Sequence, residues 1–441
     1  MNPAFKTVAV LGAGESGRAA AELLALKGAV VILRDSYTND RIETLAQKLA
    51  EIGVLVEAQP GSYTSNRFDL AVLSPGVDPA VSMVSAIRET GTVIISEIEL
   101  AFLLTDKPVI AVTGTNGKST TTELIEKILL RAGIKTEACG NIGKPFSDVV
   151  RENRDLDVIT LEVSSFQLEA IKTFRPYVSV YLNLTPDHLD RYATMQEYKA
   201  AKDRILMNQK SGDYAVVNAD LELSDTGAKK ITISGLHDRA DYVLRDGWLF
   251  AFGEKVMEQA TTRLTGPHNA ENMLAALAVA DIHKVPRAIT VAAFQDYQPL
   301  PHRCEKVRIL EGVAYINDSK ATNIDAMEKA LMGQGNSVVL IAGGKDKGFD
   351  FKPMQNIIHE KVRHAVLIGE MQEKLEEAWG EVTACHKVAD FKQAVELSRT
   401  LAVAGGVVLL SPGCSSYDMF RNFEERGEIF RNLVNQLTSN K

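Results

Sequence analysis

The sequence predicts an α/β protein with three domains: a Rossmann-like N-terminal domain, a central P-loop-type ATPase domain with a mainly parallel sheet, and a Rossmann-like C-terminal domain. Apolar runs of strand length alternate with segments of helical periodicity along the whole chain. Glycine-rich turns join a strand-like run to a helix-like segment at 12–17 and at 114–120. A chain of 441 residues is too long for one core. We expect the domains to be 1–97, 98–298 and 299–441.

The composition indicates an ordinary soluble globular protein, with 24% charged and 45% hydrophobic residues. A net charge of −8 excludes a general attraction to nucleic acid or to an anionic membrane. The N-terminus does not resemble a signal peptide, and no apolar run approaches the ~20 residues of a membrane span. The four cysteines have no metal-like spacing. We therefore expect a cytoplasmic location.

The first domain begins with a strand, a Gly12-x-Gly14-x-x-Gly17 turn and a helix, and a second strand then ends at Asp35. This pattern matches the dinucleotide fingerprint, in which an acid at that place binds a ribose hydroxyl. A helix N-terminus of this kind can hold any diphosphate. An NAD-dependent oxidoreductase and tight packing without a ligand both remain open. Two more strands are expected, at 68–73 before Ser74-Pro-Gly76 and at 92–96.

The central domain begins with a β-forming run at 109–112, the loop Gly114-Thr-Asn-Gly-Lys-Ser-Thr120 and a helical pattern at 123–130. Backbone N–H groups of such a loop can surround phosphate oxygens, while Lys118 reaches the terminal phosphates and a following hydroxyl reaches Mg²⁺. The common pattern G-x-x-x-x-G-K-[ST] requires glycine where Val112 stands, so this loop is shortened. A non-catalytic nucleotide-binding switch is an open alternative.

Two later strands of this domain end in polar residues. The strand within 156–163 carries Glu162, and the strand beginning at Val178 leads into Asp187, His188 and Asp190. Because the carboxyl ends of parallel strands share one sheet edge, we expect Glu162 and His188 to lie where Lys118 holds phosphate. Further on, 198–206 is helical, 211–220 is a strand and turn, 230–265 alternates like hairpins, and a helix starts at 266 with His268, Asn269 and Asn272.

The last third begins with a proline-bounded linker at 299–304 that carries His302 and Arg303. Strands are then expected at 313–317, 337–342, 365–369 and 407–411, which alternate with helices as in a doubly wound sheet. Three of them run into polar loops, at 318–323, 343–347 and 411–418. Phe420, Phe423 and Phe430 recur at helical spacing and are expected to face the core.

Taken together, these motifs resemble the Mur ligase family over nearly the whole chain, and within it most closely the branch that adds D-glutamate. The resemblance rests on GTNGKST (114–120), GNIG (140–143), LEVSSFQLE (161–169), DHLDRY (187–192), AAK (200–202), GPHNAEN (266–272), LPHR (300–303), NDSKATN (317–323) and SPGCSSYDMF (411–420). The D-N-P-R motif typical of the branch that adds a diamino acid is absent.

The resemblance implies a monomeric ATP-dependent ligase that joins D-glutamate to UDP-N-acetylmuramoyl-L-alanine through an acyl phosphate, in peptidoglycan precursor synthesis. It implies that ATP is bound by Gly114, Thr115, Asn116, Gly117, Lys118, Ser119, Thr120, Asn269, His302, Arg303 and Asp318. It implies Mg²⁺, with two ions expected, held by Ser119, Glu162, His188 and, if carbamoylated, Lys202.

The same resemblance assigns the acceptor substrates. The UDP part, rather than NAD, would contact Ser16, Asp35, Ser36 and Gly76, with Tyr37 standing where some relatives carry a basic residue, and Asn141 would contact the muramoyl part. Thr322, Lys347, Ser416 and Phe423 would lie around D-glutamate and the reaction site. Lys118, His188, Lys202 and Lys320 would be catalytic. Closure of the last domain is expected to bring Lys320 and Lys347 into place and to exclude water.

Overall fold

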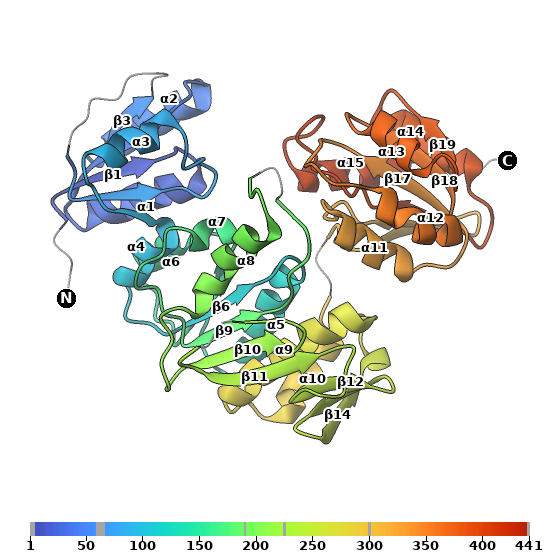
Figure 1. Ribbon diagram of the computed structural model, residues 1–441, viewed down its shortest axis with the longest axis horizontal. Helices are drawn as coiled ribbons and strands as arrows, with labels where there is room; N and C mark the ends of the chain where they lie inside the picture. Colours follow the sequence, from blue (N-terminus) through green and yellow to red (C-terminus); the bar gives the residue numbers. More distant parts are fainter. Residues whose placement is uncertain (1–4, 59–66, 189–190, 224–225, 299–300, 439–441) are drawn as a thin grey trace. The chain divides into compact units, whose positions relative to one another are not determined.

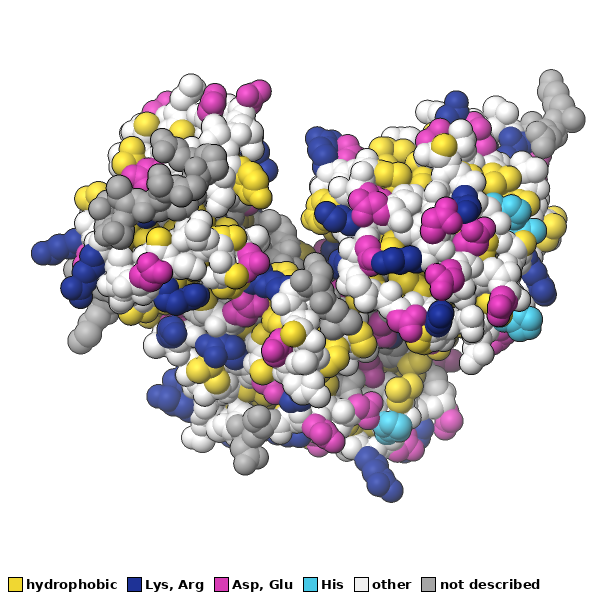
Figure 2. Space-filling model, turned by 45° about the horizontal axis from the view of Figure 1, so that its top comes forward, with side chains coloured by type: hydrophobic (Ala, Val, Ile, Leu, Met, Phe, Trp, Pro, Cys, Tyr) yellow, Lys and Arg dark blue, Asp and Glu magenta, His cyan; other side chains and the backbone are white. Residues whose placement is uncertain are grey.

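The computed structural model describes residues 5–58, 67–188, 191–223, 226–298 and 301–438. It confirms a three-domain α/β fold with three separate sheets, which are mostly parallel (Figure 1). Over these residues, no helix is both long and apolar enough to cross a membrane. On the face drawn in Figure 2, Lys and Arg side chains are interspersed with Asp and Glu, so neither charge dominates it.

The first sheet has the Rossmann-type strand order β3-β2-β1-β4-β5 and is parallel throughout. Buried aliphatic side chains fill both faces of it, as expected of a parallel sheet covered by helices. Its strands are β1 (Thr7–Leu11), β2 (Val30–Asp35), β3 (Leu55–Ala58), β4 (Leu70–Leu73) and β5 (Ile94–Ser96), and its helices are α1 (Glu15–Leu26), α2 (Asp40–Ala50) and α3 (Ser82–Glu89). Helix α4 (Glu97–Leu103) follows directly.

The central sheet has the order β14-β13-β12-β11-β10-β9-β6-β8-β7. Seven strands are parallel: β6 (Val109–Thr113), β7 (Ala138–Gly140), β8 (Ile159–Glu162), β9 (Val178–Tyr181), β10 (Tyr214–Asn218), β11 (Lys229–Ser234) and β12 (Tyr242–Arg245). The hairpins expected over 230–265 are confined to its edge, where β13 (Trp248–Ala251) and β14 (Glu254–Glu258) run antiparallel.

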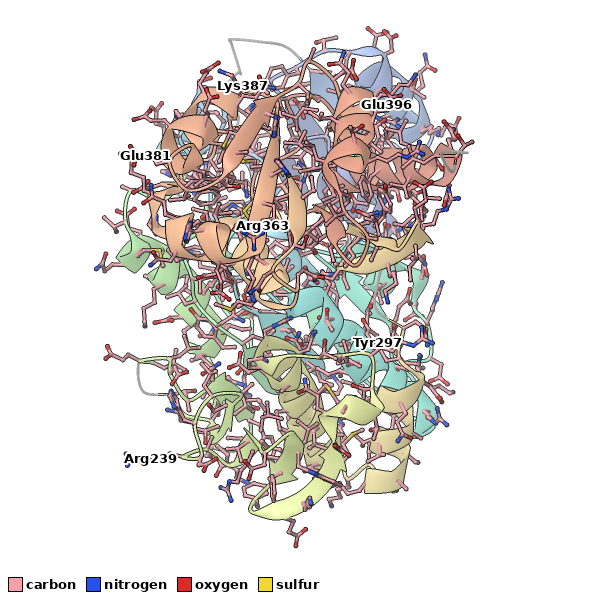
Figure 3. All side chains as sticks on the ribbon, turned by 90° about the vertical axis from the view of Figure 1, so that its right-hand side faces the viewer. Arg239, Tyr297, Arg363, Glu381, Lys387 and Glu396 are labelled. Atoms are coloured by element: carbon pink, nitrogen blue, oxygen red, sulfur yellow. The ribbon has the colours of Figure 1, made fainter. Side chains whose placement is uncertain are left out.

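Helices cover both faces of the central sheet. One face carries α5 (Lys118–Arg131), α9 (Pro267–Ile282) and α10 (Arg287–Asp296), and the other carries α4, α6 (Phe146–Glu152) and α7 (Ser165–Leu168). Helix α8 (Met195–Asp203) continues into the 3₁₀ turn Arg204–Leu206, and a second 3₁₀ turn spans Gln259–Thr261. Tyr297, labelled in Figure 3, follows α10 and donates its hydroxyl proton to Glu123 of α5 at 2.8 Å.

The third sheet has the order β15-β16-β20-β17-β18-β19, in which only β15 is antiparallel. Its strands are β15 (Glu305–Leu310), β16 (Val313–Asn317), β17 (Val338–Gly343), β18 (Val362–Ile368), β19 (Ala384–Lys387) and β20 (Val407–Leu410). One face packs against α11 (Ile324–Met332), α12 (Gln355–Lys361) and α13 (Gln372–Trp379), with a 3₁₀ turn at Lys352–Met354. The other packs against α14 (Phe391–Leu401) and α15 (Phe423–Gln436).

By compactness, the chain divides into two units. The first unit holds Met1–Leu184 and Tyr198–Tyr297, and the second holds Thr185–Glu197 and Gln298–Lys441. The first and central sheets therefore share one unit. The segment Thr185–Glu197, which includes Asp187 and His188, belongs with the last sheet although it lies in the middle of the sequence.

Candidate active site

The loop between β6 and α5 is shaped by two glycines with positive φ, Gly114 at 151° and Gly117 at 85°. A Cβ at Gly117 would come within 2.2 Å of the Asn272 side-chain oxygen, so any larger residue would both strain the backbone and push against α9. Glycine at this position lets the loop turn sharply into the N-terminus of α5. The first N–H groups of a helix lack intrahelical partners and favour an anion.

Two ammonium groups converge on the same loop. Lys118 Nζ donates to the carbonyl oxygens of Gly114 and Thr115 at 2.9 and 2.8 Å. Lys202, which is only 1% exposed, also donates to the Gly114 carbonyl, at 2.9 Å. The structure therefore brings together Lys118 and Lys202, which lie far apart in sequence. Both cations lie beside the helix terminus, which suits the binding of a highly charged anion such as a triphosphate.

Asn183, for which no motif provided a signal, holds this loop in place. The Asn183 side-chain oxygen accepts from the Asn116 N–H at 2.9 Å, and its amide nitrogen donates to the Asn116 carbonyl at 3.1 Å. The Asn183 carbonyl also accepts from the Thr115 N–H. Because Asn183 follows β9, the neighbouring parallel strand, these bonds tie the loop to the sheet edge.

A buried carboxylate lies at the end of β8. Glu162 Oε1 accepts a hydrogen bond from the Asn141 amide at 2.7 Å. Glu162 Oε2 is buried, and among the residues that the structure describes it has no hydrogen-bond partner. An unsatisfied buried carboxylate oxygen is costly unless a cation compensates it, so this atom suits a divalent metal. Nowhere in the described part of the chain do three or more His, Cys, Asp or Glu side chains gather as a metal site.

The remaining predicted ATP-binding residues of the first unit surround the start of α5. Ser119 and Thr120 are buried in its first turn. Thr121 donates to the Asn272 side-chain oxygen, and Asn272 donates to Asn269 at 3.3 Å. This chain of polar contacts links Asn269 of α9 to the first turn of α5, and its contact with ATP stays a prediction.

In the first domain, Asp35 lies against the glycine loop. Its two carboxylate oxygens accept from the Ala13 N–H at 2.7 Å and from the Tyr37 N–H at 3.0 Å. A Cβ at Gly17 would come within 1.8 Å of the Gly12 carbonyl oxygen, so the third glycine of the motif permits close packing of α1 on the loop. Ser16 and Ser36 are half-buried, whereas Gly76 and Asn141 are exposed.

In the second unit, Asp187 joins two segments that are distant in sequence. Asp187 Oδ2 accepts from the Asn323 amide at 2.9 Å, and Oδ1 accepts from Lys347 Nζ at 3.2 Å. Burial alone would raise the pKa of Asp187, but Lys347 and then His188 outweigh it and hold the pKa below its ordinary value. His188 is adjacent, with a positive φ of 56°. Glu162 and Lys118 belong to the first unit, so a site shared with His188 stays a prediction, and Asp190 lies outside the described residues.

Arg426 of α15 was missed by sequence reasoning because a single arginine in an amphipathic helix usually faces solvent. Here it is only 1% exposed, and its guanidinium donates to the Ser319 hydroxyl and carbonyl and to the Cys414 carbonyl. Burial lowers its pKa to about 10. Arg426 therefore holds together the loops that carry Lys320 and Thr322 on one side and Ser416 on the other.

Lys320 lies over the ring of Phe423, with Nζ 3.8 Å from the ring centroid. This cation–π contact brings together two predicted site residues. Phe423 was expected to face the core, and that expectation is wrong, because its ring faces Lys320. Phe430 is fully buried in the core and Phe420 packs against it, as expected. Ser416 is buried and Thr322 is half-buried.

Two residues predicted to contact ATP are buried within the second unit. His302 bonds to the Asn317 amide through Nδ1 at 2.9 Å, and burial followed by the charge of Arg431 lowers its pKa. Asp318 accepts from the Cys304 N–H and the Ser411 hydroxyl at 3.1 and 2.8 Å, and burial raises its pKa to about 7. Both side chains stabilise the start of the third sheet, and Arg303 between them is half-buried. Their contact with ATP stays a prediction.

Comparison with known proteins gives two family matches: residues 112–280 match the Mur ligase middle domain, and residues 302–414 match the Mur ligase, glutamate ligase domain. The chain is 41% identical over 444 residues to "UDP-N-acetylmuramoylalanine--D-glutamate ligase" of Geotalea uraniireducens, which covers 98% of both chains. It is also 41% identical over 445 residues to the protein of the same name from Pelotomaculum thermopropionicum, which covers 97% of both.

Solved structures share the fold at lower identity. A pseudomurein peptide ligase type C from Methanothermus fervidus has a TM-score of 0.63 at 18% identity and covers 98% of this chain and 100% of its own. The MurF ligase from Thermotoga maritima, solved with ADP, has a TM-score of 0.63 at 16% identity and covers 92% of this chain and 96% of its own. The phosphate loop, the fold and the full-length relatives agree, and the chain belongs to the Mur ligase family.

Proposed function

We propose that this protein joins D-glutamate to UDP-N-acetylmuramoyl-L-alanine with the conversion of ATP to ADP and phosphate, in peptidoglycan precursor synthesis. The observation that carries this proposal is identity of 41% over 98% of both chains to a relative named for that reaction. Short shared motifs could mark only the ligase class, whereas a match over the full length includes all the loops that recognise substrates.

The reaction follows from the weakness of a carboxylate as an electrophile. The L-alanyl carboxylate of the acceptor attacks the γ-phosphorus of ATP, and the bond to ADP breaks, which gives an acyl phosphate. The amine of D-glutamate then attacks the acyl carbon, the amide forms, and phosphate leaves with the electron pair while the amine loses a proton. Two anions meet in the first step, so Lys118 and the N-terminus of α5 are proposed to stabilise the charge on the transferring phosphoryl group.

The side chains present fit Mg²⁺, because one buried oxygen of Glu162 has no partner among the described residues. We propose that Ser119, Glu162 and His188 hold Mg²⁺, and that Lys202, once carbamoylated, holds a second ion. Bound Mg²⁺ would neutralise phosphate charge. The placement of Lys202 supports this assignment, because its side chain is buried beside the phosphate loop, and carbamoylation would replace the ammonium that now donates to the Gly114 carbonyl with an anion able to hold Mg²⁺.

The other ATP contacts and the acceptor contacts are proposed from their placement. The loop residues Gly114 to Thr120 and Asn269 would bind ATP, together with His302, Arg303 and Asp318. The turn beside Asp35, with Ser16, Ser36 and Gly76, would bind the uridine diphosphate part. Asn141 supports a muramoyl site in the central domain, since its amide contacts Glu162 at 2.7 Å.

For D-glutamate, we propose Thr322, Lys347, Ser416 and Phe423, with Lys320 at the reacting groups. Lys347 is supported by its pairing with a carboxylate, that of Asp187, which shows that its ammonium can hold the kind of group that D-glutamate carries. We further propose the domain division 1–97, 98–298 and 299–441, a monomeric state and a cytoplasmic location.

Phosphate release from ATP tests the function. With UDP-N-acetylmuramoyl-L-alanine present, D-glutamate is expected to stimulate release, whereas L-glutamate, L-alanine and a diamino acid are not. Stimulation by another amino acid would contradict the assignment of D-glutamate as the substrate but would leave the assignment as an ATP-dependent ligase in place. Oxidation or reduction of a nicotinamide cofactor, or nucleotide binding without turnover, would contradict the proposed ligase activity itself.

A further inference from the structure

Helices α1 and α6 are joined by a network of four charged side chains. Arg18 of α1 donates two hydrogen bonds to the Asp148 carboxylate of α6, at 2.5 and 3.3 Å, and another to Glu22 at 2.8 Å. Arg151 of α6 completes the network, with contacts to Asp148 at 2.8 Å and to Glu22 at 3.2 Å. Each helix thus contributes one arginine and one carboxylate. Each arginine contacts both carboxylates, Asp148 and Glu22, and therefore bridges the two helices.

The network is largely withdrawn from solvent. The side chains of Asp148, Arg18 and Glu22 are 7%, 22% and 22% exposed. Burial alone would raise the pKa of Asp148, but hydrogen bonds from Arg18 and Arg151 outweigh burial and hold the pKa below its ordinary value. Next to Asp148, the Ser147 N–H donates to the fully buried carboxylate of Glu97 at 2.6 Å, which fixes the start of α6 against α4.

The two joined helices begin at two different loops. Helix α1 starts directly after the glycine turn of the first domain, and the Arg18 N–H donates to the Gly14 carbonyl in that turn. Helix α6 follows the loop 140–143 of the central domain, in which the Asn141 amide reaches Glu162. Arg18 and Asp148 therefore connect the loop proposed for the uridine diphosphate with the loop proposed for the muramoyl group.

We propose that Arg18 and Asp148 are positioning residues that set the distance between these two halves of the acceptor site. The inference rests on the proposed function. A substrate that spans both loops gains affinity from both only when their spacing matches its own length. ATP and D-glutamate do not span this junction, so the pair affects the acceptor alone.

A nearby ion pair provides a matched control. Arg41 of α2 contacts Glu15 at the start of α1, at 3.0 Å, with both side chains more than half exposed. Glu15 also accepts from Arg18 Nε at 3.2 Å, but removal of Arg41 leaves both bonds from Arg18 to Asp148 in place. An exposed pair of this kind contributes little, so Arg41→Ala removes an arginine near the same turn without loosening the junction.

The test compares the protein with its Arg18→Ala, Asp148→Ala, double and Arg41→Ala variants. Isothermal titration measures binding of free UDP and of UDP-N-acetylmuramoyl-L-alanine, and phosphate release measures kcat and each KM. In Arg18→Ala and Asp148→Ala, the KM and Kd of the complete acceptor are expected to rise roughly tenfold. UDP binding and the KM values of ATP and D-glutamate are expected to stay unchanged. The double variant should be no worse than either single variant, and Arg18→Lys should recover part of the loss.

The outcomes separate this inference from the proposed function. An unaltered acceptor KM in folded Arg18→Ala and Asp148→Ala overturns the positioning role. So does an equal loss of UDP affinity, because that result would show general damage to the first domain. An unaltered protein that binds UDP-N-acetylmuramoyl-L-alanine but catalyses no D-glutamate-dependent release overturns the proposed reaction and leaves the positioning role standing on the binding data. If the unaltered protein does not bind UDP-N-acetylmuramoyl-L-alanine, both the proposed reaction and the positioning role are contradicted.

Discussion

The glycine loops of the first and central domains both join a buried parallel strand to the N-terminus of a long helix, but side chains of opposite charge lie against them. In the first loop the Asp35 carboxylate accepts the Ala13 N–H. In the second, Lys118 and Lys202 donate to loop carbonyls. The first loop therefore has a carboxylate beside its N–H groups, whereas the second has the ammonium of Lys118, which can meet phosphate, and that of Lys202, which we propose to hold Mg²⁺ once it is carbamoylated.

A glycine fingerprint therefore defines a backbone shape and leaves the ligand undecided. Glycine spacing at 12–17 equally fitted NAD, UDP and plain packing, because all three use the same turn. The charged groups around each loop separate a nucleoside group from a triphosphate. A carboxylate that bonds backbone N–H groups can also accept from a ribose hydroxyl, which NAD and UDP both carry, whereas a triphosphate is favoured by the Lys118 ammonium of the second loop.

The largest expected effect is at the cation of the second loop. We expect Lys118→Ala to lower kcat/KM for ATP-dependent phosphate release by roughly 10³-fold, because the charge on the transferring phosphoryl group loses a direct partner. Lys127→Ala is the control, since Lys127 lies on the same helix but donates to the Asp296 carbonyl and lies over the ring of Tyr297. Equal activity of Lys118→Ala and the unaltered protein would remove the distinction between the two loops.

Two glycines of the first loop should differ in how much their substitution by alanine destabilises the protein. A Cβ at Gly17 would come within 1.8 Å of the Gly12 carbonyl, whereas a Cβ at Gly14 meets no atom within 4 Å. We expect Gly17→Ala to lower the free energy of unfolding by about 3 kcal/mol. Gly14→Ala should change it by less than about 1 kcal/mol. Urea unfolding of both variants checks this, and similar values would mean that the third glycine has no packing role.

Two carboxylates of the first unit differ in their hydrogen bonds, and this difference predicts how the free energy of unfolding depends on pH. Asp35 accepts two N–H groups, whereas Glu97 accepts one, and its Oε2 has no partner among the described residues. Burial raises the pKa of Glu97 from 4.5 to about 7. Between these values the folded state binds more protons than the unfolded state, so stability falls as the pH rises from about 4.5 to 7 and this loss is then complete.

We expect Glu97→Gln to remove up to about 3 kcal/mol of that decline, because each unit of pKa shift corresponds to about 1.4 kcal/mol. The measurement is the free energy of unfolding from pH 5 to 8 for the variant and the unaltered protein. Asp318, whose pKa burial also raises to about 7, contributes a decline of the same sign, while His302, whose pKa is lowered, contributes a rise, so the expected result is the difference between the variant's curve and that of the unaltered protein. Parallel curves would show that Glu97 titrates normally.

The smallest expected effect is at Asp35. Asp35→Asn exchanges one carboxylate oxygen for an amide that cannot accept from a backbone N–H, so the turn beside it is weakened. We expect the KM of UDP-N-acetylmuramoyl-L-alanine to rise roughly tenfold, with the KM of ATP unchanged. Asp40→Asn, an exposed acid on the following helix, is the control. A higher KM for ATP would contradict the assignment of different ligands to the two loops.

The sequence was sufficient for the fold class and for the phosphate loop, since both depend on local patterns. The apolar run before Gly114 became β6, and the helical pattern after it became α5. Short strands such as β3, β7 and β19 were not predicted, because three or four residues of mixed polarity carry no clear period. Two expected strands also proved shorter, since the strand expected at 68–73 begins at Leu70 and the one expected at 92–96 begins at Ile94.

The interactions that hold the site together could not be predicted. Arg426 bonds Ser319 across 107 residues, and Arg18 bonds Asp148 across 130. Nothing in the local sequence of either arginine distinguishes it from a solvated surface residue, because its partner is chosen by the tertiary fold. The motifs pointed to side chains that are predicted to face ligands, and they gave no sign of those that face other loops.

The chain passes from the first unit to the second at Leu184, returns at Tyr198, and leaves again after Tyr297. The second unit is therefore not a removable module. A fragment cut at 298 would contain Lys347 and Asn323 but would lack Asp187, whose carboxylate accepts from both. Exchange of C-terminal domains between such ligases would consequently have to include residues 185–197 as a separate insert, and a recombinant C-terminal fragment would need that peptide supplied from elsewhere.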